Sequence, residues 1–163
     1  MKIMKAWGSH LPVLIKLVSI TEGPILELGG GLYSTPYLHW ACFPSKRKLV
    51  SYDSDQKYFQ QMSQYKDFFH DVFLVNDWNV VGIDFPWDIA FIDHVTERRG
   101  IDAARLANLA KYVVIHDSDP IKENIPYGYD KIYPLFKYRF DYKEISPNTT
   151  ILSNFVDLTD FKI

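Results

Sequence analysis

Cysteine is almost absent from this sequence, and no apolar run is long enough to cross a membrane. Cys42 is the single cysteine among the 163 residues, so no disulfide can form within the chain and a cytoplasmic location is expected. It stands in the apolar segment 39–43, which favours a small buried hydrophobic residue over a nucleophile. The apolar stretch 11–20 is interrupted by Pro12 and Lys16, so the sequence predicts neither a signal peptide nor a membrane partner.

Charge of one sign is also lacking, because 18 Lys and Arg residues nearly balance 20 Asp and Glu residues. The net charge of −2 argues against a nucleic-acid partner that binds over the whole surface, although it is compatible with a local basic patch. A hydrophobic fraction of 47% is sufficient for a packed core. We therefore expect a single domain over residues 1–163, with an N-terminal helical segment at 1–21 and with homo-oligomerisation left open.

Short apolar runs alternate with segments of helical spacing through most of the chain. The expected strands are 25–28, 48–52, 72–75, 87–92 and 112–116, and the expected helices are 11–20, 35–41, 54–65 and 97–110. This alternation predicts an α/β fold with a mostly parallel central sheet and helices on both faces. Two further β-prone runs, 136–145 and 149–156, flank a turn-forming Ser-Pro-Asn sequence and predict a C-terminal antiparallel hairpin. Ser9 and Ser34 are the expected N-caps of the first two helices.

Polar or glycine residues stand at or just after the end of each of the first five predicted strands. They are Glu27 with Gly29, Gly30 and Gly31, then Asp53, Asp77, Asp93 with His94, and His116 with Asp117. Right-handed crossovers bring the carboxyl ends of parallel strands to one edge of the sheet, where α/β proteins bind their ligands. The glycines permit a tight turn and a close approach of ligand to backbone, although a purely structural turn is the alternative.

Individual residues at this edge suit a nucleoside. The Asp53 carboxylate would bind ribose hydroxyls, and its alternative role is the N-cap of the following helix. Asp77 would accept a hydrogen bond from an adenine amino group, and Trp78 would form a wall beside the ring. For Trp78, packing in the core is an equally good interpretation.

These motifs resemble those of class I S-adenosylmethionine-dependent methyltransferases. Residues 26–31 resemble the glycine-rich first motif, and residues 51–53 resemble the second, whose acid holds the ribose in that family. Asp77 resembles the adenine-contacting acid of the third motif, and residues 91–94 resemble the fourth, at the reaction centre. The resemblance implies a Rossmann-like methyltransferase fold with its terminal hairpin. It also implies an S-adenosylmethionine site that contains Glu27, Gly29, Gly30, Gly31, Asp53, Asp77, Trp78 and Asp93.

A narrower resemblance, to catechol-type O-methyltransferases, concerns a metal ion. In that group Asp-His follows the fourth strand and Asp-Asn follows the fifth, and the two acids bind Mg²⁺. Here Asp93 and Asp117 match the acids, whereas Ser118 replaces the asparagine. Two carboxylates are suitable ligands for a hard cation. The alternative is that Asp93 orients the cofactor or a base and that Asp117 caps a loop.

The catalytic candidates are Asp93, His94 and His116. The lysine base of the catechol-type group has no match, so either histidine would have to accept a proton near neutral pH, although histidines are more often structural. Arg98 and Arg99 come shortly after Asp93 and His94 in the sequence. They would bind an anionic substrate group, or they would only form the solvent-exposed start of a helix.

Two segments are candidates for covering the site. Residues 124–129 form an aromatic loop that would serve as a lid or substrate wall, and residues 7–10 would fold over the cofactor.

The combined prediction is methyl transfer from S-adenosylmethionine to a small-molecule acceptor. Oxygen is the preferred acceptor atom, because no Asn-Pro-Pro-Tyr sequence follows the fourth strand. One alternative is a non-catalytic nucleoside-binding module that acts with a partner protein. A second is a nicotinamide-dependent oxidoreductase, which would share the glycine turn and Asp53 but not the terminal hairpin.

Overall fold

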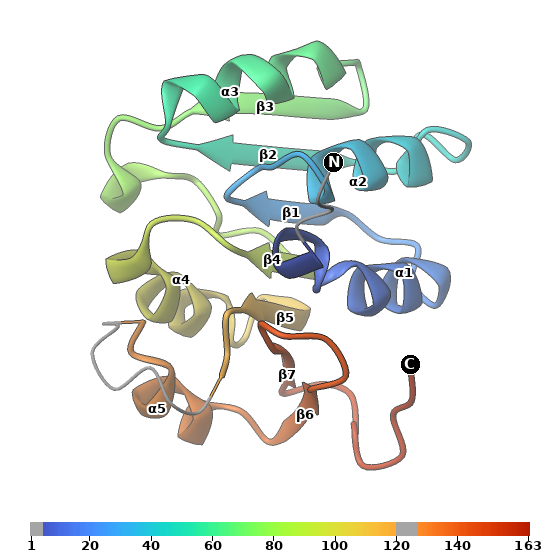
Figure 1. Cartoon of the computed structure of the whole chain (residues 1–163), viewed down its shortest axis with the longest axis vertical. Helices are drawn as coiled ribbons and strands as arrows, with labels where there is room; N and C mark the ends of the chain where they lie inside the picture. The colour runs from blue at the N-terminus through green and yellow to red at the C-terminus, as the bar shows by residue number, and fades with distance from the viewer. Residues whose placement is uncertain (1–4, 120–126) are drawn as a thin grey trace.

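The computed structural model describes residues 5–119 and 127–163 and contains a seven-stranded sheet in the order β3-β2-β1-β4-β5-β7-β6 (Figure 1). Its strands are β1 (Ile25–Leu28), β2 (Leu49–Asp53), β3 (His70–Leu74), β4 (Trp87–Ile92), β5 (Ala110–His116), β6 (Tyr138–Tyr142) and β7 (Thr149–Ser153). The first five strands are parallel, and β7 is antiparallel to both β5 and β6. The predicted α/β sheet with a terminal hairpin is therefore confirmed.

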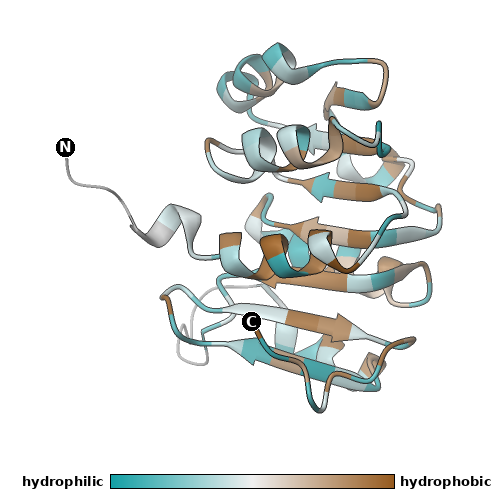
Figure 2. Ribbon diagram, turned by 90° about the vertical axis from the view of Figure 1, so that its right-hand side faces the viewer, coloured by the Kyte–Doolittle hydropathy of each residue, from teal (hydrophilic) through white to brown (hydrophobic). Residues whose placement is uncertain are grey.

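Successive residues of each central strand face opposite sides of the sheet, and each side has its own hydrophobic core. The helices are α1 (Leu11–Ser19), α2 (Ser34–Cys42), α3 (Gln56–Met62), α4 (Arg99–Leu106) and α5 (Tyr129–Ile132). In β1, Ile25 packs with residues of α1 and α2, whereas Leu26 packs with residues of α4 and α5. Figure 2 shows the resulting band of apolar residues along the strands. Helices on both faces are thus confirmed.

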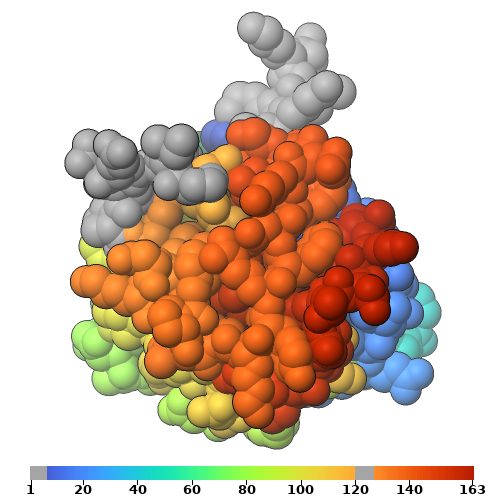
Figure 3. Space-filling view, turned by 90° about the horizontal axis from the view of Figure 1, so that it is seen from below, coloured from blue at the N-terminus to red at the C-terminus, as the bar shows by residue number. Residues whose placement is uncertain are grey.

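The C-terminal part of the chain closes one end of the sheet. Seen from below, the residues coloured orange to red cover this end and reach the blue residues near the N-terminus (Figure 3). Leu158 joins the core that α1 and α2 share, and the ring of Phe161 packs 5.1 Å from that of Phe140 in β6. Among the residues that the structure describes, no helix combines the length and apolar character needed to span a bilayer.

Several predicted boundaries and caps differ from the structure. The helix predicted at 97–110 is wrong at both ends, because α4 covers only Arg99–Leu106 and β5 already begins at Ala110. Ser9 and Ser34 are not N-caps, since His10 and Tyr33 occupy those positions without a side-chain bond. Cys42 is fully buried in the core, as predicted.

Candidate functional site

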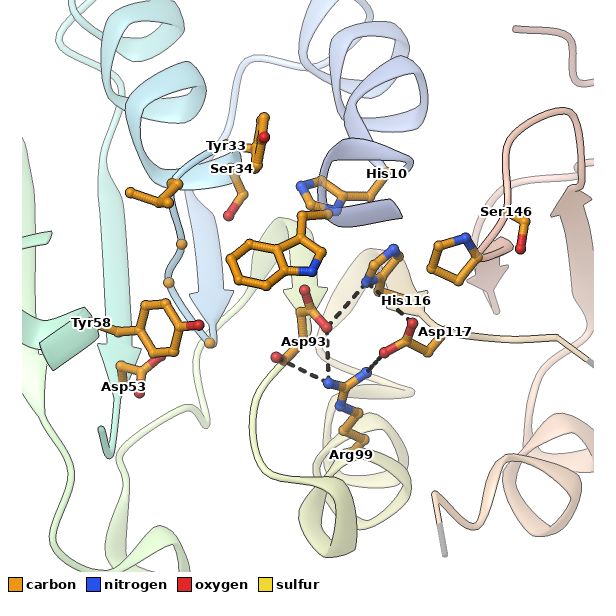
Figure 4. Close-up of a pocket in the computed structure, with 16 residues that line it drawn as sticks. His10, Tyr33, Ser34, Asp53, Tyr58, Asp93, Arg99, His116, Asp117 and Ser146 are labelled. Atoms are coloured by element: carbon orange, nitrogen blue, oxygen red, sulfur yellow. Dashed lines mark hydrogen bonds and ion pairs between the residues drawn. The ribbon is translucent and has the colours of Figure 1, made fainter. Parts of the chain in front are cut away.

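A cavity of about 550 Å³ lies at the carboxyl ends of the parallel strands (Figure 4). Its walls come from the segments that follow β1, β2, β4 and β5, from the N-terminal segment, and from the turn before β7. The lining residues are Trp7, His10, Gly29, Gly30, Gly31, Leu32, Tyr33, Ser34, Asp53, Tyr58, Asp93, Arg99, His116, Asp117, Ser146 and Pro147. Strand ends that are far apart in sequence therefore meet at one rim.

At two positions of the glycine loop after β1, an added Cβ would overlap neighbouring atoms. Gly29 has a φ of 91°, and a Cβ there would overlap the backbone of Asp93 and His94 after β4. A Cβ at Gly30 would overlap the sulfur of Met62, whereas a Cβ at Gly31 would have Ser34 Oγ, 3.9 Å away, as its nearest neighbour. Gly29 is thus required by packing and backbone conformation, a side chain at Gly30 would displace Met62, and Gly31 borders open space.

Glu27 lies beneath this loop and does not line the cavity. Its buried carboxylate accepts a hydrogen bond from Thr35 Oγ1 at 2.9 Å, and Thr35 Oγ1 in turn accepts one from the Gly31 amide at 3.0 Å. Burial raises the pKa of Glu27 to about 7. The side chain therefore supports the glycine loop through Thr35 and has no surface open to a ligand.

The polar chain below Glu27 extends further into the protein. Ser51 Oγ donates to Glu27 Oε2 at 2.5 Å and lies 2.9 Å from His70 Nε2. Nδ1 of His70 lies 3.2 Å from Nδ1 of His39 on α2. Sequence reasoning missed Thr35, Ser51 and both histidines, because nothing in their local pattern distinguishes them from ordinary strand and helix residues.

Asp53 ends β2 and lines the cavity beside Tyr58, which the sequence did not single out. Its Oδ1 accepts a hydrogen bond from the Asp55 amide at 2.7 Å, and burial raises the pKa of its carboxyl to about 6. The alternative role as a helix N-cap is excluded, because Asp55 caps α3 by accepting from the Lys57 amide at 2.7 Å.

Asp93 and Asp117, the predicted metal ligands, both face the guanidinium of Arg99. Arg99 lies 2.9 Å from Asp93 Oδ1 and 2.9 Å from Asp117 Oδ2, and its Nε donates to the His94 carbonyl at 2.7 Å. Burial alone would lower the pKa of Arg99, but the two carboxylates raise it above its usual value. Both carboxylates are already held by Arg99, and Ser118 stands in place of the asparagine of the catechol-type group, so these residues do not reproduce the magnesium site of that group.

The solvated helix start expected at this position is wrong for Arg99, which is only 7% exposed. Arg98, its neighbour in sequence, pairs instead with Asp102 at 2.8 Å. The aromatic loop proposed as a lid lies outside the described residues at 124–126. Within the described part, the ring of Tyr127 lies 4.8 Å from the Arg99 guanidinium, and its hydroxyl donates to Asp117 at 3.3 Å.

His94, Asp77 and Trp78 are not brought to the cavity. His94 is buried against α4, where its Nε2 lies 2.9 Å from Asp102 Oδ2. Its ring packs 4.3 Å from Trp78, which belongs to the core beneath α4 and α5. The exposed Asp77 caps a short 3-10 helix by accepting from the Asn79 amide at 2.9 Å. The packing interpretation of Trp78 is thus the one that the structure favours.

His116, by contrast, lies at the end of β5 and faces both Asp93 and the N-terminal segment. Its Nε2 lies 2.8 Å from Ser9 Oγ, and its Nδ1 lies 3.2 Å from Asp93 Oδ1. The ring of His10 stands 4.9 Å away, and its own burial, followed by the proximity of His116, lowers its pKa to about 4. Trp7 and His10 line the cavity, so the segment 7–10 does lie over the site. No sequence pattern indicated that His10 and Ser9 would meet His116.

Comparison with known proteins identifies the fold. No known protein-family profile matches the sequence, and no curated protein matches it significantly. Among solved structures, cofactor-bound Rv0187 from MTB has a TM-score of 0.70 at 13% identity, over 96% of this chain and 84% of that one. A candidate O-methyltransferase from Klebsiella pneumoniae has a TM-score of 0.67 at 13% identity, over 92% and 80%.

The N-terminal domain of human METTL16 in complex with SAH is a third similar structure. It has a TM-score of 0.61 at 7% identity, and the match covers 90% of this chain and 69% of that one. At such identities the similarity establishes a shared fold, which is the Rossmann-like fold of class I methyltransferases.

Proposed function

We propose that this chain is an S-adenosylmethionine-dependent methyltransferase that acts on a small-molecule acceptor through an oxygen atom. The observation that carries the proposal is the meeting of the tight glycine loop and Asp53 on one cavity, at the carboxyl edge of a sheet with methyltransferase topology. In open α/β sheets this edge is where nucleotides and nucleosides bind. Two of the similar structures are bound to a cofactor or to SAH.

The residues of the cavity fit such a cofactor. Gly29, Gly30 and Gly31 line the cavity, with open space beside Gly31, and the adjacent N-terminus of α2 offers backbone N–H groups to a carboxylate. Asp53 is a carboxylate on the same cavity, suited to two ribose hydroxyls. These features support assignment of the glycine loop, Ser34, Asp53 and Tyr58 to the cofactor half of the cavity.

The remaining wall is suited to the acceptor. The cofactor supplies a methyl group that its sulfonium already activates, so holding the acceptor oxygen in line provides most of the rate. Asp93 stands between the cofactor half and His116, and these two side chains would orient the acceptor hydroxyl. Of the two predicted histidines, His116 is the one we assign to the acceptor, because His94 is buried against Asp102.

Titration with S-adenosylhomocysteine by calorimetry tests the cofactor half of this proposal. Wild-type protein should bind it, and Asp53→Asn should weaken binding by about 1–3 kcal/mol, which is roughly 5- to 150-fold. The control is Asp71→Asn on β3, whose exposed carboxylate pairs with Lys48 away from the cavity. Folded wild-type protein that produces no heat of binding, or equal losses in both variants, would refute the assignment.

Methyl transfer itself is tested with isotopically labelled S-adenosylmethionine and a panel of small phenols and alcohols. We expect label in at least one acceptor and none when His116→Ala replaces the wild type. Binding of the cofactor without transfer to any acceptor would favour a binding module instead. The nicotinamide alternative is disfavoured, because β7 runs antiparallel to its neighbours, and an NADH titration separates the two.

A further inference from the structure

Three side chains of the types that commonly bind metals meet at the end of the cavity that we assign to the acceptor. They are His10, just before α1, Asp93, just after β4, and His116, the last residue of β5. Each offers one ligand atom, and these atoms all lie within 4.8 Å of one another. In Figure 4 the three side chains come from three separate elements and lie around one end of the cavity.

His10 is the most informative of the three. It is only 2% exposed, yet neither of its ring nitrogens has a hydrogen-bond partner within the described part of the chain. A buried polar group without a partner costs free energy, so native proteins normally satisfy such groups with protein, water or an ion. His10 also lines the cavity.

His116 shows the same deficiency at one nitrogen. Its Nδ1 lies 3.2 Å from Asp93 Oδ1, but the contact lacks hydrogen-bond geometry and the buried nitrogen has no other hydrogen-bond partner among the described residues. Its Nε2 is held by Ser9 Oγ at 2.8 Å. When Nε2 carries the proton and donates it to Ser9, Nδ1 presents a lone pair toward Asp93, as in histidines oriented to bind a metal.

Charge around the cluster is compatible with a cation. Arg99 pairs with both Asp93 and Asp117, so these three side chains together carry one net negative charge. Arg99 also anchors the Asp93 carboxylate, as outer-sphere partners do in metal sites. Both ring nitrogens of His10 lack a hydrogen-bond partner among the described residues, so one of them can offer a lone pair.

We propose that His10, Asp93 and His116 bind a divalent transition metal of the Zn²⁺ or Co²⁺ type. Two imidazole nitrogens and one carboxylate oxygen favour late first-row metals, whereas Mg²⁺ prefers oxygen ligands alone. Three protein ligands leave a coordination position open toward the cavity, where the acceptor would lie under the proposed function. This site differs from the Asp93–Asp117 pair that the sequence suggested. Its ligands include His10 and His116, and Asp117 is not a ligand but pairs with Arg99.

Titration of the metal-free full-length chain with Co²⁺, followed by visible absorption, tests this site. We expect one ion per chain with d–d bands in the visible range. The affinity for Co²⁺ should fall by more than about 100-fold in His10→Ala and in His116→Ala. This is a larger loss than is expected when a residue that only orients a metal ligand is removed. His39→Gln is the control, because His39 is a histidine of α2 that does not line the cavity. Zn²⁺ should displace Co²⁺, and millimolar Mg²⁺ should not.

A second measurement covers the case in which a variant folds poorly. Zn²⁺ should raise the melting temperature of the wild type and of His39→Gln but not that of Asp93→Asn, because a ligand stabilises only the folded state that binds it. Absence of Co²⁺ binding by the wild type, or equal binding by His10→Ala, would overturn the proposal. Binding of S-adenosylhomocysteine, measured on the same samples without metal, tests the cofactor site separately, so failure of one assignment does not count against the other.

Discussion

The hydroxyl of Ser9 lies 2.8 Å from Nε2 of His116, although 107 positions separate the two residues in the sequence. Both residues are buried, so water does not compete for this bond. The contact fastens the segment before α1 to the carboxyl end of β5. It thereby keeps His10 and Trp7 on the wall of the cavity, and makes the N-terminal segment a part of the site.

We expect Ser9→Ala to lower the free energy of unfolding by about 1–3 kcal/mol, because the buried His116 nitrogen loses its partner. Ser19→Ala is the matched control, since the Ser19 hydroxyl donates to the Lys16 carbonyl in an exposed position. Its effect should stay within about 0.5 kcal/mol. Urea unfolding of both variants provides the measurement, and equal effects would show that the Ser9 contact contributes nothing specific.

Gly29→Ala and Gly31→Ala should differ sharply although the glycines are two positions apart. Gly29 has a φ of 91°, and a Cβ there would overlap the backbone of Asp93 and His94, whereas Gly31 has room for a Cβ. Gly29→Ala should therefore cost more than about 2 kcal/mol of stability, and Gly31→Ala less than about 1 kcal/mol. Denaturant unfolding measures both, and a well-folded Gly29→Ala protein would contradict the described loop.

Arg99→Met should destabilise the protein by about 3–5 kcal/mol, because it leaves the carboxylates of Asp93 and Asp117 without their buried cation. Arg99→Lys should rescue this only in part, since an ammonium cannot reproduce the planar fork of the guanidinium. Lys48→Met is the control, because Lys48 pairs with Asp71 at the surface and exposed pairs contribute roughly 0–1 kcal/mol. Thermal unfolding in low salt compares the three variants. Equal losses of stability in Lys48→Met and Arg99→Met would show that the pairing of Arg99 with Asp93 and Asp117 contributes no more than a surface ion pair.

The parts of the fold that depend on short-range patterns could be predicted from the sequence. The apolar runs at β1 and β4 gave their residue bounds, and the topology rules for parallel strands placed Gly29, Asp53, Asp93 and His116 at one edge. The antiparallel end of the sheet followed from the two β-prone runs around a proline-containing turn.

The errors arose where a contact across the sheet outweighs a local preference. Ser9 has the residue type and the position of a helix N-cap, but its hydroxyl contacts His116 of β5 instead. Arg99 has the pattern of a solvated helix start, but two acids from other strand ends surround it. His94 follows β4 beside Asp93, yet Asp102 on α4 holds it away from the cavity. Such outcomes depend on side-chain direction at the strand ends, which a one-dimensional pattern does not specify.

Glu27 should make the protein less stable as the pH rises toward neutrality. Burial raises the pKa of its carboxyl from 4.5 to about 7 in the folded state. Between these values the folded protein keeps a proton that the unfolded chain has released, so the free energy of unfolding falls as the pH increases. The stabilisation is fully present below about pH 4.5 and is lost by about pH 7. At 1.36 kcal/mol per pKa unit, the expected loss is on the order of 3 kcal/mol.

Glu27→Gln should remove most of this slope, because the amide oxygen can still accept from Thr35 and the side chain no longer titrates. Urea unfolding of both proteins at intervals from pH 4.5 to 7.5 gives the comparison. The pKa of Asp53 is also raised by burial, to about 6, so part of the wild-type slope has the same sign and belongs to that residue. In Asp53→Asn the free energy of unfolding should therefore depend less on pH below about pH 6, and its decrease between about pH 6 and 7 should remain. Parallel curves for wild type and Glu27→Gln would mean that the carboxyl beneath the glycine loop is already ionised in the folded protein at pH 4.5, and that its hydrogen bonds to Thr35 and Ser51 compensate fully for its burial.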